Sequence, residues 1–90
     1  MDVDKQEKKV VSRLKAERER QKLSQLELSY RSDVSQNMIA YIESGKRVPS
    51  LSTVLKLCNA LNIYPSELFQ DEDEKKNELK EKIVELAQRL

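Results

Sequence analysis

The sequence contains no histidine and only one glycine, Gly45, among its 90 residues. Without histidine, zinc binding by mixed cysteine and histidine ligands and proton transfer by an imidazole are both excluded. A single glycine is too few for a glycine-rich phosphate-binding loop. The carboxylates are scattered along charged helix faces, where they are ordinarily solvated. We therefore expect a protein that is not an enzyme and that holds no cofactor or metal ion.

Cysteine, proline and long apolar runs are scarce as well. The one cysteine, Cys58, allows no intramolecular disulfide, and its place in an apolar helical pattern predicts a small core residue rather than a reactive thiol. Two prolines and one glycine disfavour a loop-rich or β-rich fold. No apolar run approaches the length of a membrane span, and nothing resembles a signal peptide. We expect a cytoplasmic protein that makes no membrane contact.

The residues that are abundant suit short amphipathic helices, with 38% hydrophobic and 37% charged. The net charge is only +1, but it is unevenly distributed. Residues 1–69 carry 12 Lys and Arg against 9 Asp and Glu, whereas residues 70–90 carry 5 against 7. Binding to nucleic acid depends on a local basic face rather than on the total charge. The mildly basic character of residues 1–69 is therefore compatible with nucleic-acid binding.

Apolar periodicity predicts an all-α fold. Residues 1–7 are polar and show no periodicity, so they are expected to be a disordered N-terminus. Apolar spacings of three and four predict helices over about 8–21, 25–32, 36–44, 51–61 and 75–90, with a short helix beginning at Pro65. Inward-facing positions are predicted at Val10, Val11, Leu14, Leu28, Ile39, Ile42, Leu51, Val54, Leu55, Cys58, Leu61, Leu68 and Phe69, and in part at Leu26.

Two of these helices are short and closely spaced. Ser24 and Ser35 are good N-caps for them, as Ser50 is for the helix over 51–61, and Glu27 can complete a capping box with Ser24. Two capped helices joined by a turn of three or four residues have the geometry of a helix-turn-helix. In that geometry the second helix enters the major groove of DNA and presents its N-terminal residues to base edges.

The outward side chains of the second helix are uncharged, which suits base reading. Gln36 and Asn37 can each pair with adenine through two hydrogen bonds, and Ala40 can contact a thymine methyl group. Tyr41 can reach a phosphate or stack along the wall of the groove. The alternative is that Gln36 and Asn37 are ordinary first-turn residues. We predict that Gln36, Asn37, Ala40 and Tyr41 read the bases.

Other polar residues flank this helix and are predicted to hold phosphates. Gln25 begins the preceding helix, where its amide and its backbone N–H face the positive helix end. Lys46 and Arg47 follow the second helix and are expected on the same face. The predicted phosphate contacts are Gln25, Ser35, Lys46 and Arg47.

The ordered motifs of residues 8–69 resemble the Cro/C1-type helix-turn-helix family, also called the xenobiotic-response-element family. The resemblance is carried by Ile39 and by the runs Leu23–Ser29, Val34–Gln36, Ile42–Arg47, Pro49–Ser50 and Leu61–Phe69. It implies a five-helix, phage-repressor-like domain whose third helix is the recognition helix, and an ion pair between Arg18 and Glu43. The chain departs from the family pattern at three positions: Ser29 replaces the usual alanine, and Asp33 and Asn62 replace glycines.

Residues 70–90 form a separate amphipathic segment. Leu79, Ile83, Leu86 and Leu90 recur at heptad-like spacing and need to be covered. The segment can fold back on its own domain, pair with a second copy or bind another protein. Pairing is attractive, because two copies one DNA turn apart would read a palindrome.

We therefore predict a homodimeric, nucleoid-associated regulator, a repressor or autoregulator, that binds double-stranded DNA at a palindromic operator. The alternative is an antitoxin-like module whose main contact is a partner protein.

Overall fold

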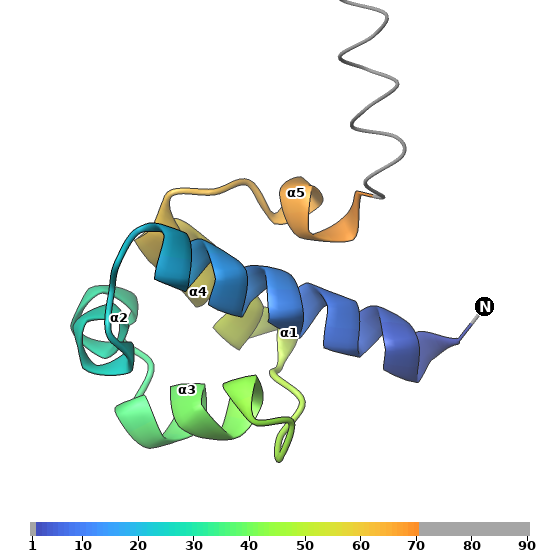
Figure 1. Cartoon of the computed structure of the whole chain (residues 1–90), viewed down its shortest axis with the longest axis horizontal. Coiled ribbons are helices and arrows are strands. Elements are labelled where there is room, and N and C mark those ends of the chain that lie inside the picture. The colour runs from blue at the N-terminus through green and yellow to red at the C-terminus, as the bar shows by residue number, and fades with distance from the viewer. Residues whose placement is uncertain (1, 71–90) are drawn as a thin grey trace, which may run out of the picture.

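The computed structural model describes residues 2–70, and these residues form five α-helices (Figure 1). In chain order the helices are α1 (Val3–Arg20), α2 (Gln25–Ser32), α3 (Gln36–Glu43), α4 (Leu51–Leu61) and α5 (Pro65–Phe69). No strand occurs between residues 2 and 70, and the all-α class is confirmed. The helix expected over residues 75–90 lies outside the described residues.

The serine caps begin three of these helices as predicted. The Ser24 side chain accepts a hydrogen bond from the Glu27 backbone N–H at 3.0 Å, and the Ser24 N–H donates to Glu27 Oε1 at 3.2 Å. Both halves of the capping box are therefore formed. Ser35 caps α3 and Ser50 caps α4 in the same way, each accepting at 3.1 Å from the N–H three residues later.

Left-handed backbone ends α2 and α4. Asp33 has φ 59° and Asn62 has φ 56°, so both non-glycine residues adopt the conformation that the sequence pattern requires. Gly45, at φ 83°, follows the end of α3. Lys22 also has a positive φ of 58° in the turn between α1 and α2, which the sequence did not indicate.

The expectation of a disordered N-terminus is wrong for residues 3–7, because α1 begins at Val3 rather than near residue 8. Asp2 caps the helix, and its carboxylate accepts from the Lys5 N–H at 3.3 Å. Val3 precedes the buried Val10 by seven residues, so both lie on one side of α1. One exposed valine among polar residues gave no periodicity to recognise.

The core is formed by all five helices and the connections between them. Its buried members are Val10, Leu14, Leu23, Leu28, Val34, Ile39, Ile42, Val54, Leu57, Cys58, Leu61 and Leu68. Three predicted core positions are wrong, because Leu51, Leu55 and Phe69 are 71%, 41% and 63% exposed. The inward face of α4 instead includes Leu57, because spacings of three and four from Val54 select that side of the helix. Cys58 is fully buried as predicted, and burial, with the charge of Glu67, raises the pKa of its thiol.

Helix packing leaves one side of α3 uncovered. α2 packs on α3 and α4, while α1 contacts α3, α4 and α5 (Figure 1). α3 lies at one edge of this arrangement, below α1 in the view of Figure 1. The fold therefore holds α3 from one side and leaves its other side open to solvent.

Candidate nucleic-acid interface

The two faces of α3 differ in burial as the sequence predicted. Ile39 and Ile42 are each 1% exposed and anchor the helix in the core. On the opposite side, Gln36 and Asn37 are exposed. Tyr41 is exposed too, and Ala40 is half-buried. The four residues predicted to read bases thus lie away from the core on one short helix.

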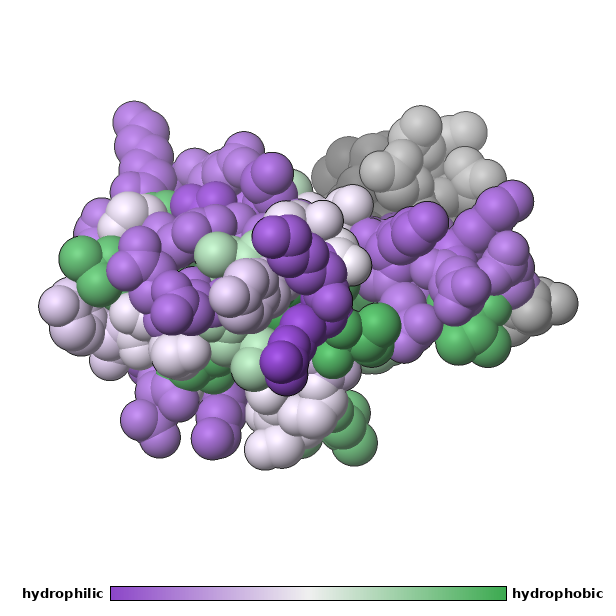
Figure 2. All heavy atoms as spheres, turned by 90° about the horizontal axis from the view of Figure 1, so that it is seen from below, coloured by the Kyte–Doolittle hydropathy of each residue, from purple (hydrophilic) through white to green (hydrophobic). Residues whose placement is uncertain are grey.

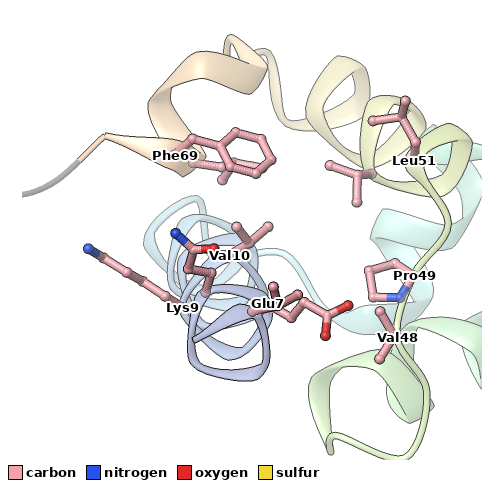
Figure 3. A pocket seen from close by; sticks show the side chains of 11 residues that line it. Glu7, Lys9, Val10, Val48, Pro49, Leu51 and Phe69 are labelled. Carbon is pink, nitrogen blue, oxygen red and sulfur yellow. The ribbon is translucent and has the colours of Figure 1, made fainter. Parts of the chain in front are cut away.

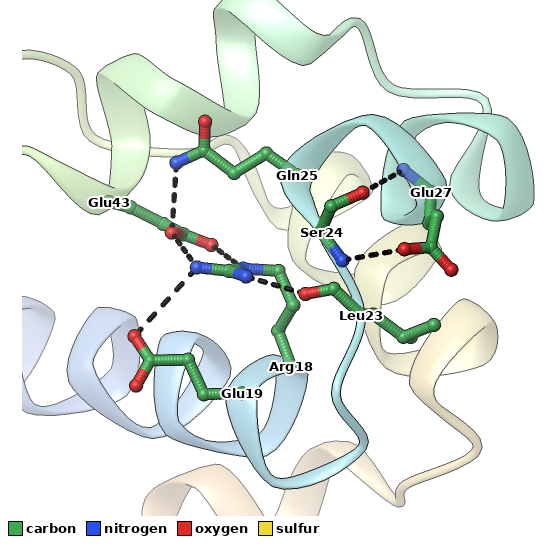
Figure 4. Close-up of polar contacts among 7 residues, drawn as sticks. All are labelled: Arg18, Glu19, Leu23, Ser24, Gln25, Glu27 and Glu43. Atoms are coloured by element: carbon green, nitrogen blue, oxygen red, sulfur yellow. Dashed lines mark hydrogen bonds and ion pairs between the residues drawn. The ribbon is translucent and has the colours of Figure 1, made fainter.

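A buried ion pair fixes the C-terminal end of α3 (Figure 4). Arg18 Nε donates to Glu43 Oε2 and Arg18 Nη2 donates to Glu43 Oε1, each at 2.8 Å. The two side chains are only 11% and 8% exposed. Arg18 Nη1 also donates to the Leu23 carbonyl at 2.6 Å. The pair implied by the family resemblance is present, and it ties α1 to α3 and to the turn before α2.

Electrostatics favour the ionised form of this pair. The hydrogen bond to Glu43 raises the pKa of Arg18 above its ordinary value. Burial by itself would raise the pKa of Glu43, but the hydrogen bonds from Arg18 and Gln25 and the charge of Arg18 outweigh it. The pKa of Glu43 therefore lies below its ordinary value. Because Glu43 is the only acidic residue of α3, the helix presents no unpaired carboxylate to an approaching phosphate backbone.

Gln25 is arranged differently from the expectation that its amide faces a phosphate. Its Nε2 donates to Glu43 Oε1 at 3.1 Å, so the amide nitrogen belongs to the ion-pair network (Figure 4). The backbone N–H of Gln25 stands in the first turn of α2, where a helix supplies no acceptor. That N–H, rather than the amide nitrogen, is the group that can meet a phosphate. The sequence shows a glutamine at the start of this helix, but it does not show that the amide group contacts Glu43, which is 18 residues away.

The loop after α3 is held against the end of that helix. The backbone N–H groups of Lys46 and Arg47 donate to the Tyr41 carbonyl at 2.8 and 3.1 Å. The Lys46 ammonium stands 5.7 Å from the centroid of the Tyr41 ring. Both basic side chains are exposed. The predicted phosphate contacts at this end therefore lie beside the predicted base-reading helix.

The side of the molecule on which α3 lies is predominantly hydrophilic (Figure 2). Ser35 is exposed at the start of α3; its oxygen caps the helix, and its hydroxyl hydrogen can donate to a phosphate. Between residues 2 and 70, no three potential metal-binding side chains come together. Within the same residues, no helix combines the length and apolarity of a membrane span. The predicted contact residues of the tail, Leu79, Ile83, Leu86 and Leu90, lie outside the described part.

Comparisons with known proteins agree with this geometry. The family model described as helix-turn-helix matches residues 14–68. Over 54 residues the chain is 41% identical to a protein of Sinorhizobium fredii named HTH-type transcriptional regulator y4dL. The match covers 60% of this chain but only 28% of that relative. No solved structure matches the chain. The family match covers more than half of the chain and includes the whole of α2 and α3. The protein therefore belongs to the Cro/C1-type helix-turn-helix family of DNA-binding regulators.

Proposed function

We propose that this protein binds double-stranded DNA with sequence specificity through α3 and regulates transcription as a dimeric repressor or autoregulator in the cytoplasm. The observation that carries the proposal is the exposed, uncharged face of α3, fixed in place by the buried Arg18–Glu43 pair. A helix face that is only solvated ordinarily carries lysine and glutamate. Amide side chains on a rigidly held helix can instead make paired hydrogen bonds with the edges of DNA bases. The name of the relative from Sinorhizobium fredii supports the same function.

In the proposed complex, the N-terminal half of α3 lies in the major groove. Gln36 and Asn37 pair with adenine edges, and Ala40 contacts a thymine methyl group. Tyr41 reaches the wall of the groove, beside Lys46. These four side chains would give the specificity.

Phosphates would be held on both sides of α3. At one side are the backbone N–H of Gln25 and the hydroxyl group of Ser35, each at the start of a helix, where the dipole favours an anion. At the other side are the side chains of Lys46 and Arg47. These contacts position the helix without reading sequence.

Dimerisation is proposed because one module alone makes only a small interface with DNA. Two copies whose recognition helices lie about 34 Å apart would contact successive major grooves and read a palindromic operator. The apolar stripe at Leu79, Ile83, Leu86 and Leu90 is the proposed contact between copies.

The salt dependence of binding tests DNA contact directly. We expect Lys46→Ala to weaken binding to duplexes of every sequence and to lower the slope of log K against log salt by about one unit. Lys56→Ala is the matched control, since Lys56 is an exposed lysine on α4, outside the α2–α3 unit. Fluorescence anisotropy with a labelled duplex measures both. An unchanged slope for Lys46→Ala would contradict its assigned contact, and absence of any duplex binding at low salt would overturn the function.

A module that binds a partner protein is the second candidate. It is favoured by an apolar groove between α1, the loop before α4, α4 and α5 (Figure 3), whose lining includes four exposed apolar side chains. The same titration separates the two functions, because a module of this second kind needs no affinity for duplex DNA.

A further inference from the structure

The chain leaves α3 through a Schellman motif, which brings two side chains of the predicted DNA surface together. The Lys46 N–H donates to the Tyr41 carbonyl at 2.8 Å, and the Gly45 N–H donates to the Ile42 carbonyl at 3.1 Å. Gly45 has φ 83°, the left-handed conformation that this motif requires. Residues in the places of Tyr41 and Lys46 commonly make an apolar contact in such a motif, so the backbone makes these two side chains neighbours.

In this chain the contact joins a cation to an aromatic ring. The Lys46 ammonium stands over the Tyr41 ring, 5.7 Å from its centroid. At that separation the negative face of the ring attracts a cation. Both side chains are exposed, Tyr41 at 41%. The ammonium has three N–H donors and the ring covers only one side of it, so donors remain for a phosphate oxygen.

The rest of the turn fixes the position of the ring. The Tyr41 carbonyl also accepts hydrogen bonds from the Arg47 N–H at 3.1 Å and from the Ser44 hydroxyl at 3.2 Å. The next two residues of α3 are anchored, Ile42 in the core and Glu43 in the buried ion pair. The Tyr41 ring is therefore attached to a rigid helix end, whereas a lysine side chain is by itself a flexible four-carbon stem.

We propose that Tyr41 is a positioning residue for Lys46, whose ammonium it holds where a phosphate of the bound duplex lies. This inference rests on the proposed function and adds to the place of Tyr41 at the wall of the major groove. A free lysine side chain loses rotamer freedom when it is ordered at an interface. A lysine that is already held on a ring loses less. Tyr41 therefore strengthens binding to every sequence through Lys46, without touching the phosphate itself.

NMR spectroscopy of the full chain without DNA tests the pair itself. The ring current of an aromatic side chain shifts protons over its face to higher field. We expect the ε-methylene protons of Lys46 at higher field in the wild type than in Tyr41→Leu, and close to the wild-type position in Tyr41→Phe. Lys56, an exposed lysine on α4, is the internal control and should not shift. Equal positions of the Lys46 protons in the wild type and in Tyr41→Leu would overturn the proposal.

A double-mutant cycle measures the coupling of the pair in DNA binding. Fluorescence anisotropy with one labelled duplex gives the Kd of the wild type, Tyr41→Leu, Lys46→Ala and the double variant. We expect the loss of affinity caused by Tyr41→Leu to be about two- to tenfold greater with Lys46 present than with alanine there, as ordering of one long side chain requires. Tyr41→Phe should retain the coupling, because a phenyl ring also attracts a cation.

Folding of the leucine variant is checked by urea unfolding. The hydrogen bonds of the turn use the Tyr41 carbonyl rather than its side chain, so they are kept in Tyr41→Leu. Leucine also has a high helix propensity. We therefore expect similar unfolding midpoints for the wild type, Tyr41→Leu and Tyr41→Phe. If Tyr41→Leu unfolds early, Tyr41→Met replaces it in the cycle.

The cycle separates this inference from the proposed function. Independent effects of the two substitutions would overturn the inference. A coupling of the opposite sign would mean that the ring and the phosphate compete for the ammonium, and it would overturn the inference as well. Both results leave DNA binding by the wild type in place. A wild-type chain that binds no duplex at low salt would overturn the proposed function and the inference together.

Discussion

At the scale of single residues, Glu43 links the packing of α1 and α2 to the position of α3, the helix proposed to read DNA. Its carboxylate accepts from Arg18 on α1 and from Gln25 on α2, while its backbone belongs to α3. The positions of the caps and of Ile39 and Ile42 were predictable from sequence, because local spacing determines them. The Gln25–Glu43 contact was not, because a hydrogen bond between distant residues leaves no periodic signal.

Removal of the Glu43 carboxylate should therefore destabilise the whole domain. Glu43→Ala leaves Arg18 buried without its partner, which costs about 3 kcal/mol. The matched control is Arg20→Ala, which removes an ion pair with Glu17. Because the Arg20 side chain is 70% exposed, this substitution should change the free energy of unfolding very little. Urea unfolding measures both. Equal losses of stability in the two variants would contradict the structural role of the buried pair.

The lowered pKa of Glu43 also predicts a pH dependence. The folded state favours the ionised carboxylate, so its stabilisation is present above the ordinary pKa of 4.5 and is lost as the pH falls through the lowered value. The difference in free energy of unfolding between the wild type and Glu43→Gln should then narrow between neutral pH and about pH 3. A difference that stays constant over that range would show that ionisation of Glu43 contributes nothing.

Base reading at Asn37 makes a prediction of its own. Asn37→Ala should cost about 1–3 kcal/mol on the preferred sequence and relax specificity at one base pair per half-site. Lys46→Ala should instead weaken all sequences alike. Competition binding with single-base variants of the preferred duplex distinguishes the two patterns. A uniform loss for Asn37→Ala would assign that residue to the phosphate backbone.

At the scale of elements, the residue that ends α2, Asp33, has a strained left-handed backbone conformation. Asp33 has φ 59°, where a residue with a β-carbon is disfavoured and glycine is not. We expect Asp33→Gly to stabilise the domain by about 1 kcal/mol and Asp33→Ala to destabilise it. Denaturant midpoints measure both changes. A more stable alanine variant would mean that the backbone of this turn is not left-handed.

Element boundaries were predictable where caps mark them and uncertain where they do not. α2, α3 and α4 begin directly after their serine caps, whereas α1 begins five residues before the expected start. Asp2 is also a capping residue, but no apolar pattern follows it to show that it begins a helix. The same lack of pattern hid the groove, because Val3 and Val48 become neighbours of Phe69 only through the tertiary fold.

At the scale of the whole molecule, the described residues present two surfaces of different character. The α3 face is polar and rigid, and it is proposed to read DNA. The groove is apolar and favours contact with a partner protein. Sequence patterns predicted the first surface, because recognition residues occupy fixed positions in the helix-turn-helix. They predicted an apolar stripe at Leu79, Ile83, Leu86 and Leu90 but not the groove.

The most direct test of the central claim is selection of bound sequences from a pool of random duplexes by the full chain. We expect an enriched palindrome whose half-sites lie about one helical turn apart, with altered sequence preference when Gln36 and Asn37 are both changed to alanine. No enrichment at low salt and high protein concentration would contradict sequence-specific DNA binding through α3.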